Sequence, residues 1–230
     1  MSDAFTDAFV GLDSRMKLIE IVTNNLANAQ TTGFKRDFGR VLESEQLLDV
    51  GTTLDATAGV VAFTGNPLDA AVDGEGFFAI QTPAGVRFTR NGSFSLNEDG
   101  DLVTKEGMKV LGSSGTPINL IGNDIAIQDG GIVTLDGNEA ATLKIVSFRN
   151  LAMLQKEGAN RYVWNGSIDG VQDVDEPRVK SGSLERSNVN STTEIIQLMG
   201  AYREFESVQR TLKTLDTDMN AKLIQELGRI

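Results

Sequence analysis

Cysteine and histidine are both absent from this chain of 230 residues, and proline occurs only four times. The sequence therefore offers no thiol nucleophile, no thiolate metal ligand, no disulfide and no imidazole base. Catalysis would have to depend on carboxylates, lysine, serine, threonine or tyrosine. We predict no catalytic residues, no metal site and no cofactor.

Long apolar runs are lacking as well. No stretch of about 18 apolar residues exists, so we expect no membrane insertion. The N-terminal MSDAFTDAF has neither a basic region nor a small-residue cleavage site, so we expect any export to proceed without a cleaved signal peptide. The formal net charge of −11 argues against nucleic acid and anionic lipid as partners. A hydrophobic content of 40% still supports a core in one or two domains.

Apolar residues at both ends recur at helical spacing. The C-terminal series follows Ser191-Thr192-Thr193-Glu194, a capping-box signature, and predicts a helix that ends near Leu227. The N-terminal series predicts a helix that begins at Ser2 and Asp3. The two series advance by steps of three or four residues. They consist of Phe5, Phe9, Leu12, Met16, Ile19, Thr23 and Leu26, and of Ile195, Leu198, Tyr202, Phe205, Val208, Leu212, Leu215 and Met219.

The middle of the chain has the pattern of short strands between glycine-rich turns. We expect strands at Phe77–Gln81, Val86–Thr89, Ser93–Leu96, Leu102–Thr104, Ile125–Ile127, Ile132–Leu135 and Thr142–Phe148. The pattern of residues 37–66 does not indicate one type of secondary structure. Val41–Leu48 is compatible with a helical turn or two, and Val50–Gly59 is compatible with a linker. The predicted fold class is α+β, with a bundle domain of residues 1–36 and 184–230, a linker region of 37–66 and a β-rich middle domain of 67–183.

The terminal stripes have two interpretations. Most apolar helix faces cover the body of their own chain, but the heptad spacing suits helix-on-helix packing between the two ends. The asparagine side chains on the opposite face of the N-terminal helix also have two interpretations. Asn24 and Asn28 share a face opposite Leu26, where they could bond a neighbouring molecule. They could also face water and end the helix before Gly33.

Three segments resemble the bacterial flagellar axial proteins, which include the rod, hook and hook-associated proteins. These segments are NNLANAQTTGFK, the block from Thr64 to Gly112, and SGSLERSNVNSTTEIIQLMGAYREFE. Together they cover roughly half the chain, and their order makes the resemblance specific. The length and the segment Arg203-Glu204-Phe205-Glu206 are more similar to proximal-rod members (FlgF type) than to distal-rod members (FlgG type) or the larger hook protein. The helix beyond the C-terminal signature is longer than the signature requires.

The resemblance implies that both termini form a coiled-coil-like bundle and that the middle forms an outward all-β domain of short antiparallel strands. It implies a structural subunit of a hollow rod in the basal body, which spans the periplasm, transmits torque and conducts later subunits. The implied partners are copies of the chain, other flagellar rod and hook proteins, and the flagellar export apparatus. The expected assembly residues are Phe5, Phe9, Leu12, Met16, Ile19, Asn24, Asn25, Leu26, Asn28, Gly33, Phe34, Asn188, Asn190, Ile195, Leu198, Tyr202, Phe205, Leu212 and Leu215.

Two local motifs could carry other chemistry. Ser95–Glu106 nearly matches a calcium loop but has Ser at its first position and strands as flanks, so a hairpin that turns at Asp99-Gly100 accounts for it better. Asp73 and Glu75 form a close carboxylate pair in a glycine-rich turn with no second catalytic group nearby. Trp164 is expected to pack between strands and turns.

The alternatives to a rod subunit are therefore a stand-alone β-domain binding module, with the helices as its lid, and a carboxylate hydrolase dependent on Asp73 or Glu75.

Overall fold

The computed structural model describes residues 2–44, 47–122, 124–158 and 160–227. Side chains are described for 10–39, 51–122, 124–158, 160–214, 216, 217 and 221. The chain forms two compact units, and each unit is made of segments that are separated in the sequence. The helical unit contains the residues up to Ala27, Asp37–Thr53 and the residues from Asn190 onward, and the β-body contains Asn28–Arg36 and Leu54–Val189.

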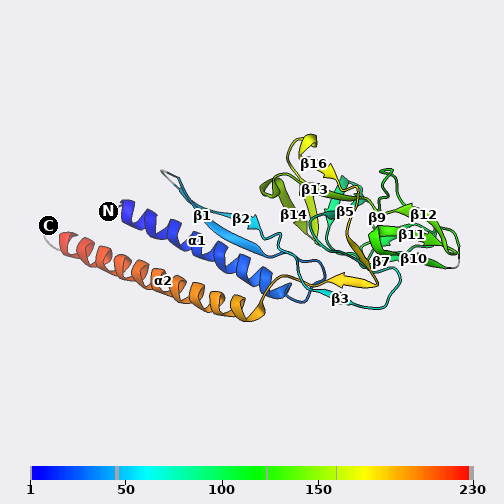
Figure 1. The fold of residues 1–230 in the computed structure, drawn as a ribbon. Helices are drawn as coiled ribbons and strands as arrows, with labels where there is room; N and C mark the ends of the chain where they lie inside the picture. The colour runs from blue at the N-terminus through cyan, green and yellow to red at the C-terminus, as the bar shows by residue number, and fades with distance from the viewer. Residues whose placement is uncertain (1, 45–46, 123, 159, 228–230) are drawn as a thin grey trace. The chain divides into compact units, whose positions relative to one another are not determined.

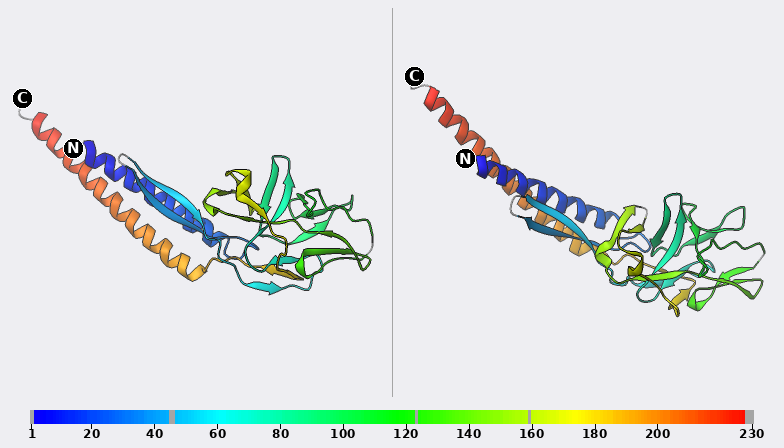
Figure 2. Two further views of the ribbon diagram at one scale, coloured as in Figure 1. Left: turned by 45° about the horizontal axis from the view of Figure 1, so that its top comes forward. Right: turned by 90° about the horizontal axis from the view of Figure 1, so that it is seen from above.

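Two long helices and a two-stranded ribbon make up the helical unit. The helices are α1 (Ser2–Ala27) and α2 (Ser191–Leu227), and they lie side by side with the strands β1 (Asp37–Ser44) and β2 (Leu47–Leu54) along α1 (Figures 1 and 2). The predicted helical turn at Val41–Leu48 is wrong, because this segment contributes to β1 and β2. Both predicted helices are present, and α2 continues to Leu227, the last residue that the structure describes.

The cap of α2 lies one residue before the predicted one. The Asn190 side-chain oxygen accepts a hydrogen bond from the Thr193 backbone N–H at 3.1 Å, and its carbonyl accepts from the Glu194 N–H at 3.0 Å. Asn190 is therefore the N-cap residue, and asparagine is among the best residues for that role. The predicted capping box of Ser191 and Glu194 is wrong, because Asn190 caps the helix and the buried Glu194 carboxylate accepts a hydrogen bond from Asn25.

The β-body is built from short strands that pair antiparallel. One large sheet has the order β14-β15-β6-β5-β9-β8-β7, and β13 pairs with β5 and β16 beside it. Smaller sheets are β10-β11-β12, β17-β4 and β18-β3. The bounds are β3 Val61–Phe63, β4 Ala70–Val72, β5 Phe77–Thr82, β6 Gly85–Thr89, β7 Phe94–Leu96, β8 Leu102–Thr104, β9 Lys109–Val110, β10 Ile125–Ile127, β11 Ile132–Leu135, β12 Asn138–Thr142, β13 Ile145–Phe148, β14 Leu154–Gly158, β15 Arg161–Trp164, β16 Val171–Asp173, β17 Val179–Ser181 and β18 Ser183–Glu185.

Most predicted strands are confirmed within one residue at either end. The exception is Thr142–Phe148, which the structure divides between the end of β12 and β13. The hairpin at Asp99-Gly100 is also confirmed: β7 pairs with β8, and the Asn97 side-chain oxygen accepts from the N–H groups of Asp99 and Asp101. Gly100 has φ +80°, which a glycine adopts without strain.

Two apolar clusters fill the β-body. The larger is centred on Phe78, Ile80, Leu102 and Leu143, and the second on Phe77, Phe88 and Tyr162. Trp164 stacks on Phe148 with ring centroids 5.0 Å apart and donates from Nε1 to the Ser167 carbonyl, as its predicted packing role requires. Among the helices that the structure describes, none is apolar over the length that a bilayer crossing would need.

Candidate assembly surface

The seam between α1 and α2 is formed by part of the predicted stripe. Leu198, Phe205 and Leu212 recur every seven residues along α2 and are half-buried. On α1, Val22 is buried, and Leu12, Ile19 and Leu26 are half-buried. An ion pair between Arg15 and Glu204, at 3.0 Å, also joins the two helices. The two helices pack against each other, so pairing within the chain covers part of both apolar faces.

Asn25 is directed inward within its own helical unit. Its side chain is 1% exposed and its oxygen accepts from the Asp37 N–H at 2.9 Å. Its amide nitrogen donates to the Asp37 carbonyl at 2.8 Å and to the Glu194 carboxylate at 3.3 Å. These bonds tie the last turn of α1 to β1 and to the first turn of α2. Within a single chain, the amide thus has three hydrogen bonds that hold the unit together.

A second apolar stripe of α2 remains exposed beside the seam. Ile195, Met199 and Tyr202 are spaced by four and three residues, and Ile196 lies next to them. Their exposed fractions range from 46% to 66%. Met16 on α1 and Phe38 on β1 add two more exposed apolar side chains to the helical unit. We refer to Ile195, Ile196, Met199 and Tyr202 as the exposed stripe.

Of the exposed stripe, sequence reasoning found Ile195 and Tyr202 but missed Ile196 and Met199. The available signal was the consecutive pair Ile195-Ile196, because two adjacent apolar residues cannot both face one narrow seam. Farther along the helices, a groove of about 460 Å³ lies over Leu12 and Leu212, and Glu206, Gln209, Arg210 and Lys213 also line it.

The loop after α1 belongs to the β-body. Gly33 has φ +67°, and its N–H donates to the Glu185 carbonyl at 2.7 Å. Phe34 is buried beneath the Lys156 ammonium, which lies 3.9 Å from the ring centroid. Asn28 accepts a hydrogen bond from the Thr31 hydroxyl at 3.1 Å. The glycine and phenylalanine of the N-terminal signature thus hold this loop in place within the β-body.

Asn188 connects the other segments that pass near this loop. Its side-chain oxygen accepts from the Arg36 N–H at 2.7 Å, and its nitrogen donates to the carbonyls of Asp55 and Thr57 at 3.0 and 3.1 Å. Asn24 is exposed on α1. The side chains of Phe5, Phe9 and Leu215 lie outside the described residues.

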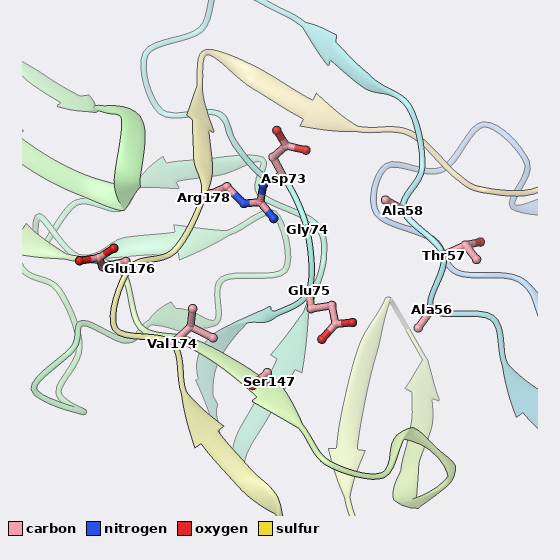
Figure 3. Close-up of a pocket in the computed structure, with 10 residues that line it drawn as sticks. All are labelled: Ala56, Thr57, Ala58, Asp73, Gly74, Glu75, Ser147, Val174, Glu176 and Arg178. Carbon is pink, nitrogen blue, oxygen red and sulfur yellow. The ribbon is translucent and has the colours of Figure 1, made fainter.

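A hollow of about 620 Å³ in the β-body contains the carboxylates that a hydrolase would need (Figure 3). Asp73, Glu75 and Glu176 line it together with Arg178. Asp73 pairs with Lys180 at 3.0 Å, and this hydrogen bond is the main reason why the pKa of Asp73 lies below its usual value. A carboxyl group held in its charged form is a poor proton donor, so Asp73 is poorly suited to act as a general acid.

Three segments of the chain match models of known protein families. "Flagella basal body rod protein" matches residues 14–35, "Flagellar hook protein FlgE/F/G D1 domain" matches 71–138, and "Flagellar basal body rod FlgEFG protein C-terminal" matches 180–226. Paired terminal helices, a β-rich middle and these matches define a class: structural proteins of the bacterial flagellar axis.

Whole-chain relatives narrow this class. The chain is 32% identical to the flagellar basal-body rod protein FlgF of Caulobacter vibrioides, over 96% of this chain and 98% of the relative. It is 31% identical to FlgF of Rhizobium meliloti, with 97% and 98% covered, and 30% identical to FlgG of Bacillus subtilis, with 94% of each covered. The chain belongs to the FlgF/FlgG family of flagellar basal-body rod proteins, and it is a structural rod subunit and not an enzyme.

Proposed function

We propose that this chain is a proximal-rod subunit of the FlgF type, and that it polymerises through the helical unit. The similarity to two FlgF proteins over nearly their whole length supports the FlgF type over the distal-rod FlgG type. The neighbours would be copies of the chain and other rod or hook proteins. In this arrangement the helices form a coiled-coil-like bundle that transmits torque and surrounds the channel through which later subunits pass.

The exposed stripe is the observation that carries the assembly proposal. It lies beside a seam that already joins α1 to α2, so a helix from a second subunit could extend the packing without disturbing the first pair. Full burial of an exposed large apolar side chain gains about 1.5–3 kcal/mol, and each of these roughly half-exposed side chains would gain part of that. A rod that repeats the contact at every subunit gains this contribution many times.

We also propose that the chain is exported through the flagellar secretion channel and reaches the basal body by that route. A chain that threads a narrow channel must be unfolded, and a disulfide formed early would obstruct it. The complete absence of cysteine is compatible with this route.

The test is whether a variant restores swimming to a bacterial strain from which this protein has been deleted. The double variant Ile196→Ser and Met199→Ser should keep the helical circular dichroism of the purified subunit, because both side chains are already solvent-exposed. It should nevertheless fail to build a rod and fail to restore swimming.

The matched control makes the same chemical change on the β-body, at Ile121→Ser and Ile168→Ser, whose side chains are 81% and 86% exposed. This control should restore swimming. If the stripe variant swims as well as the wild type, assembly through the stripe is wrong. If the β-body variant fails instead, the β-body carries the interaction, as a binding module would.

A further inference from the structure

Glu185 of β18 carries a carboxylate that is completely buried between two buried cations. Its Oε1 lies 2.6 Å from the Lys35 ammonium and its Oε2 lies 3.3 Å from the Arg90 guanidinium. The three side chains are at most 2% exposed. All three belong to the β-body, and they come from the loop after α1, from the end of β6 and from β18.

The same glutamate also binds two backbone segments. Its Oε1 accepts from the Gly59 N–H at 2.7 Å, and its carbonyl accepts from the Gly33 N–H at 2.7 Å. Lys35 in turn donates to the Thr57 carbonyl at 2.7 Å. Glu185 therefore holds three segments together, near positions 33–35, 57–59 and 90. All three precede it in the sequence by about a hundred positions or more.

The other hydrogen bonds of Lys35 and Arg90 are to backbone carbonyls, and the more weakly acting carboxylates of Asp55 and Glu75 influence them only through their charge. Arg90 donates to the carbonyls of Gly74 and Val72 at 2.7 and 3.3 Å and lies over the Phe77 ring, 5.0 Å from its centroid. Burial lowers the pKa of Lys35, while the charge of Glu185 opposes that shift, and Arg90 and Asp55 also face the ammonium. Without Glu185 the site would hold two buried positive charges, and removal of one partner from a buried pair is strongly destabilising.

We propose that Glu185 is a charge lock that closes the β-body: the loop Asn28–Arg36 and the segment around Thr57 and Gly59 pack only when β18 has docked. Folding of the β-body is then all-or-none with respect to the arrival of residues near the C-terminal end of that unit. A chain that has not yet delivered β18 keeps Lys35 and Arg90 in water. This inference concerns the single subunit and does not depend on the assembly proposal.

The test is urea unfolding of the full chain, followed through Trp164, which is the only tryptophan and lies in the β-body. Glu185→Gln keeps the shape and removes the charge. It should raise the unfolding equilibrium constant by about 10²- to 10³-fold. Glu157→Gln removes the carboxylate of the more exposed pair with Arg87 and should change the constant by less than about fivefold.

The double variant Lys35→Met and Glu185→Gln tests whether the lost stability comes from unpaired buried charge and not from altered packing. It removes one of the two cations that Glu185→Gln leaves buried, so it should recover at least about tenfold of the lost stability. If Glu185→Gln does not fold, the double variant should restore folding. Simple additivity of the two single changes, or a double variant that stays unfolded, would overturn the charge lock.

Hydrogen exchange tests the all-or-none closure. In Glu185→Gln the amides of Gly33 and Gly59 should exchange faster by the same factor as the Ala79 amide, which donates to the Lys144 carbonyl within the core. Faster exchange at Gly33 and Gly59 alone, with Ala79 unchanged, would show that the loop opens independently and would refute the proposal.

Discussion

Asn25 and Glu194 are 169 positions apart in the sequence, yet the amide of one donates to the buried carboxylate of the other at 3.3 Å. Each side chain is 1% exposed. The contact joins the last turn of α1 to the first turn of α2, and the bonds of Asn25 to Asp37 add β1 to the same point. One asparagine of the N-terminal signature therefore organises the helical unit.

Replacement of Asn25 by Leu should destabilise the helical unit. The change keeps the approximate volume but removes three hydrogen bonds from a buried site, at a cost of about 1–3 kcal/mol. Circular dichroism at the helix band measures it, because both described α-helices lie in this unit. Thr23→Ala, on the exposed side of α1, should alter stability by less than about 0.5 kcal/mol. Equal melting of the two variants would exclude the organising role of Asn25.

Gly33→Ala should destabilise the β-body more than Gly107→Ala. Both glycines have positive φ, +67° and +77°, so both changes incur the left-handed cost of about 1–2 kcal/mol. A Cβ on Gly33 would also lie 2.5 Å from backbone atoms of Arg90 and Asn91, whereas one on Gly107 meets nothing within 4 Å. Urea unfolding monitored by Trp164 should therefore separate the variants, and equal midpoints would contradict the close approach.

Acid should weaken the hairpin that contains Asp101. Hydrogen bonds from Lys109, Asn119 and Asn97 lower the pKa of this carboxyl group. Because the pKa is lower in the folded state, the stabilisation is complete well above the unfolded value of about 3.9 and is lost as the pH falls through the folded pKa. Asp101→Asn should thus be less stable than wild type at pH 6, and the difference should shrink below about pH 4.

A variant at the exposed Asp99, in the same turn, is the control for this pH series. At pH 6, Asp99→Asn should cost less stability than Asp101→Asn, because the Asp99 side chain is exposed whereas that of Asp101 is buried. A constant gap between Asp101→Asn and wild type across the series would mean that the carboxylate charge is not the stabilising group.

Gly170→Ala should displace the ring of Trp164. A Cβ at this position would lie 2.4 Å from Cζ2 of the indole, which is stacked on Phe148 and cannot move aside freely. We expect a shift of the tryptophan emission to longer wavelength and a loss of about 1–3 kcal/mol from overpacking. Gly107→Ala serves here as the control and should leave the emission unchanged. An unshifted spectrum in Gly170→Ala would argue against the stacked position.

The two helices and about half of the described body strands could be predicted because their signals are local. The C-terminal helix has an apolar pattern that is sustained to Leu227, and the Asp99-Gly100 turn has its own side-chain hydrogen bonds. The strands β17 and β18 are three residues long and exist through pairing with β4 and β3, more than a hundred positions away. No local pattern marks such strands. The strands β1 and β2 differ, because they pair with each other, but their sequence was predicted to form a helical turn and a linker.

The candidate surface was predictable only in part, for a related reason. A heptad pattern identifies Leu198 and Tyr202 equally well, but only the packed structure shows that the first is in the seam and the second is exposed. Lys35 and Glu185 are typical surface residues in composition, and their burial depends on a partner far along the chain. The sequence singled out Asn25 and Asn188 as polar residues of the N- and C-terminal signatures. It did not predict that both side chains form hydrogen bonds within the chain.

Electron microscopy of purified basal bodies that contain this chain tests the central claim most directly. The account predicts the chain within the rod, with its helices packed against those of neighbouring subunits and with Ile196, Met199 and Tyr202 buried in those contacts. A rod in which these three side chains face solvent, or one from which the chain is absent, would contradict it.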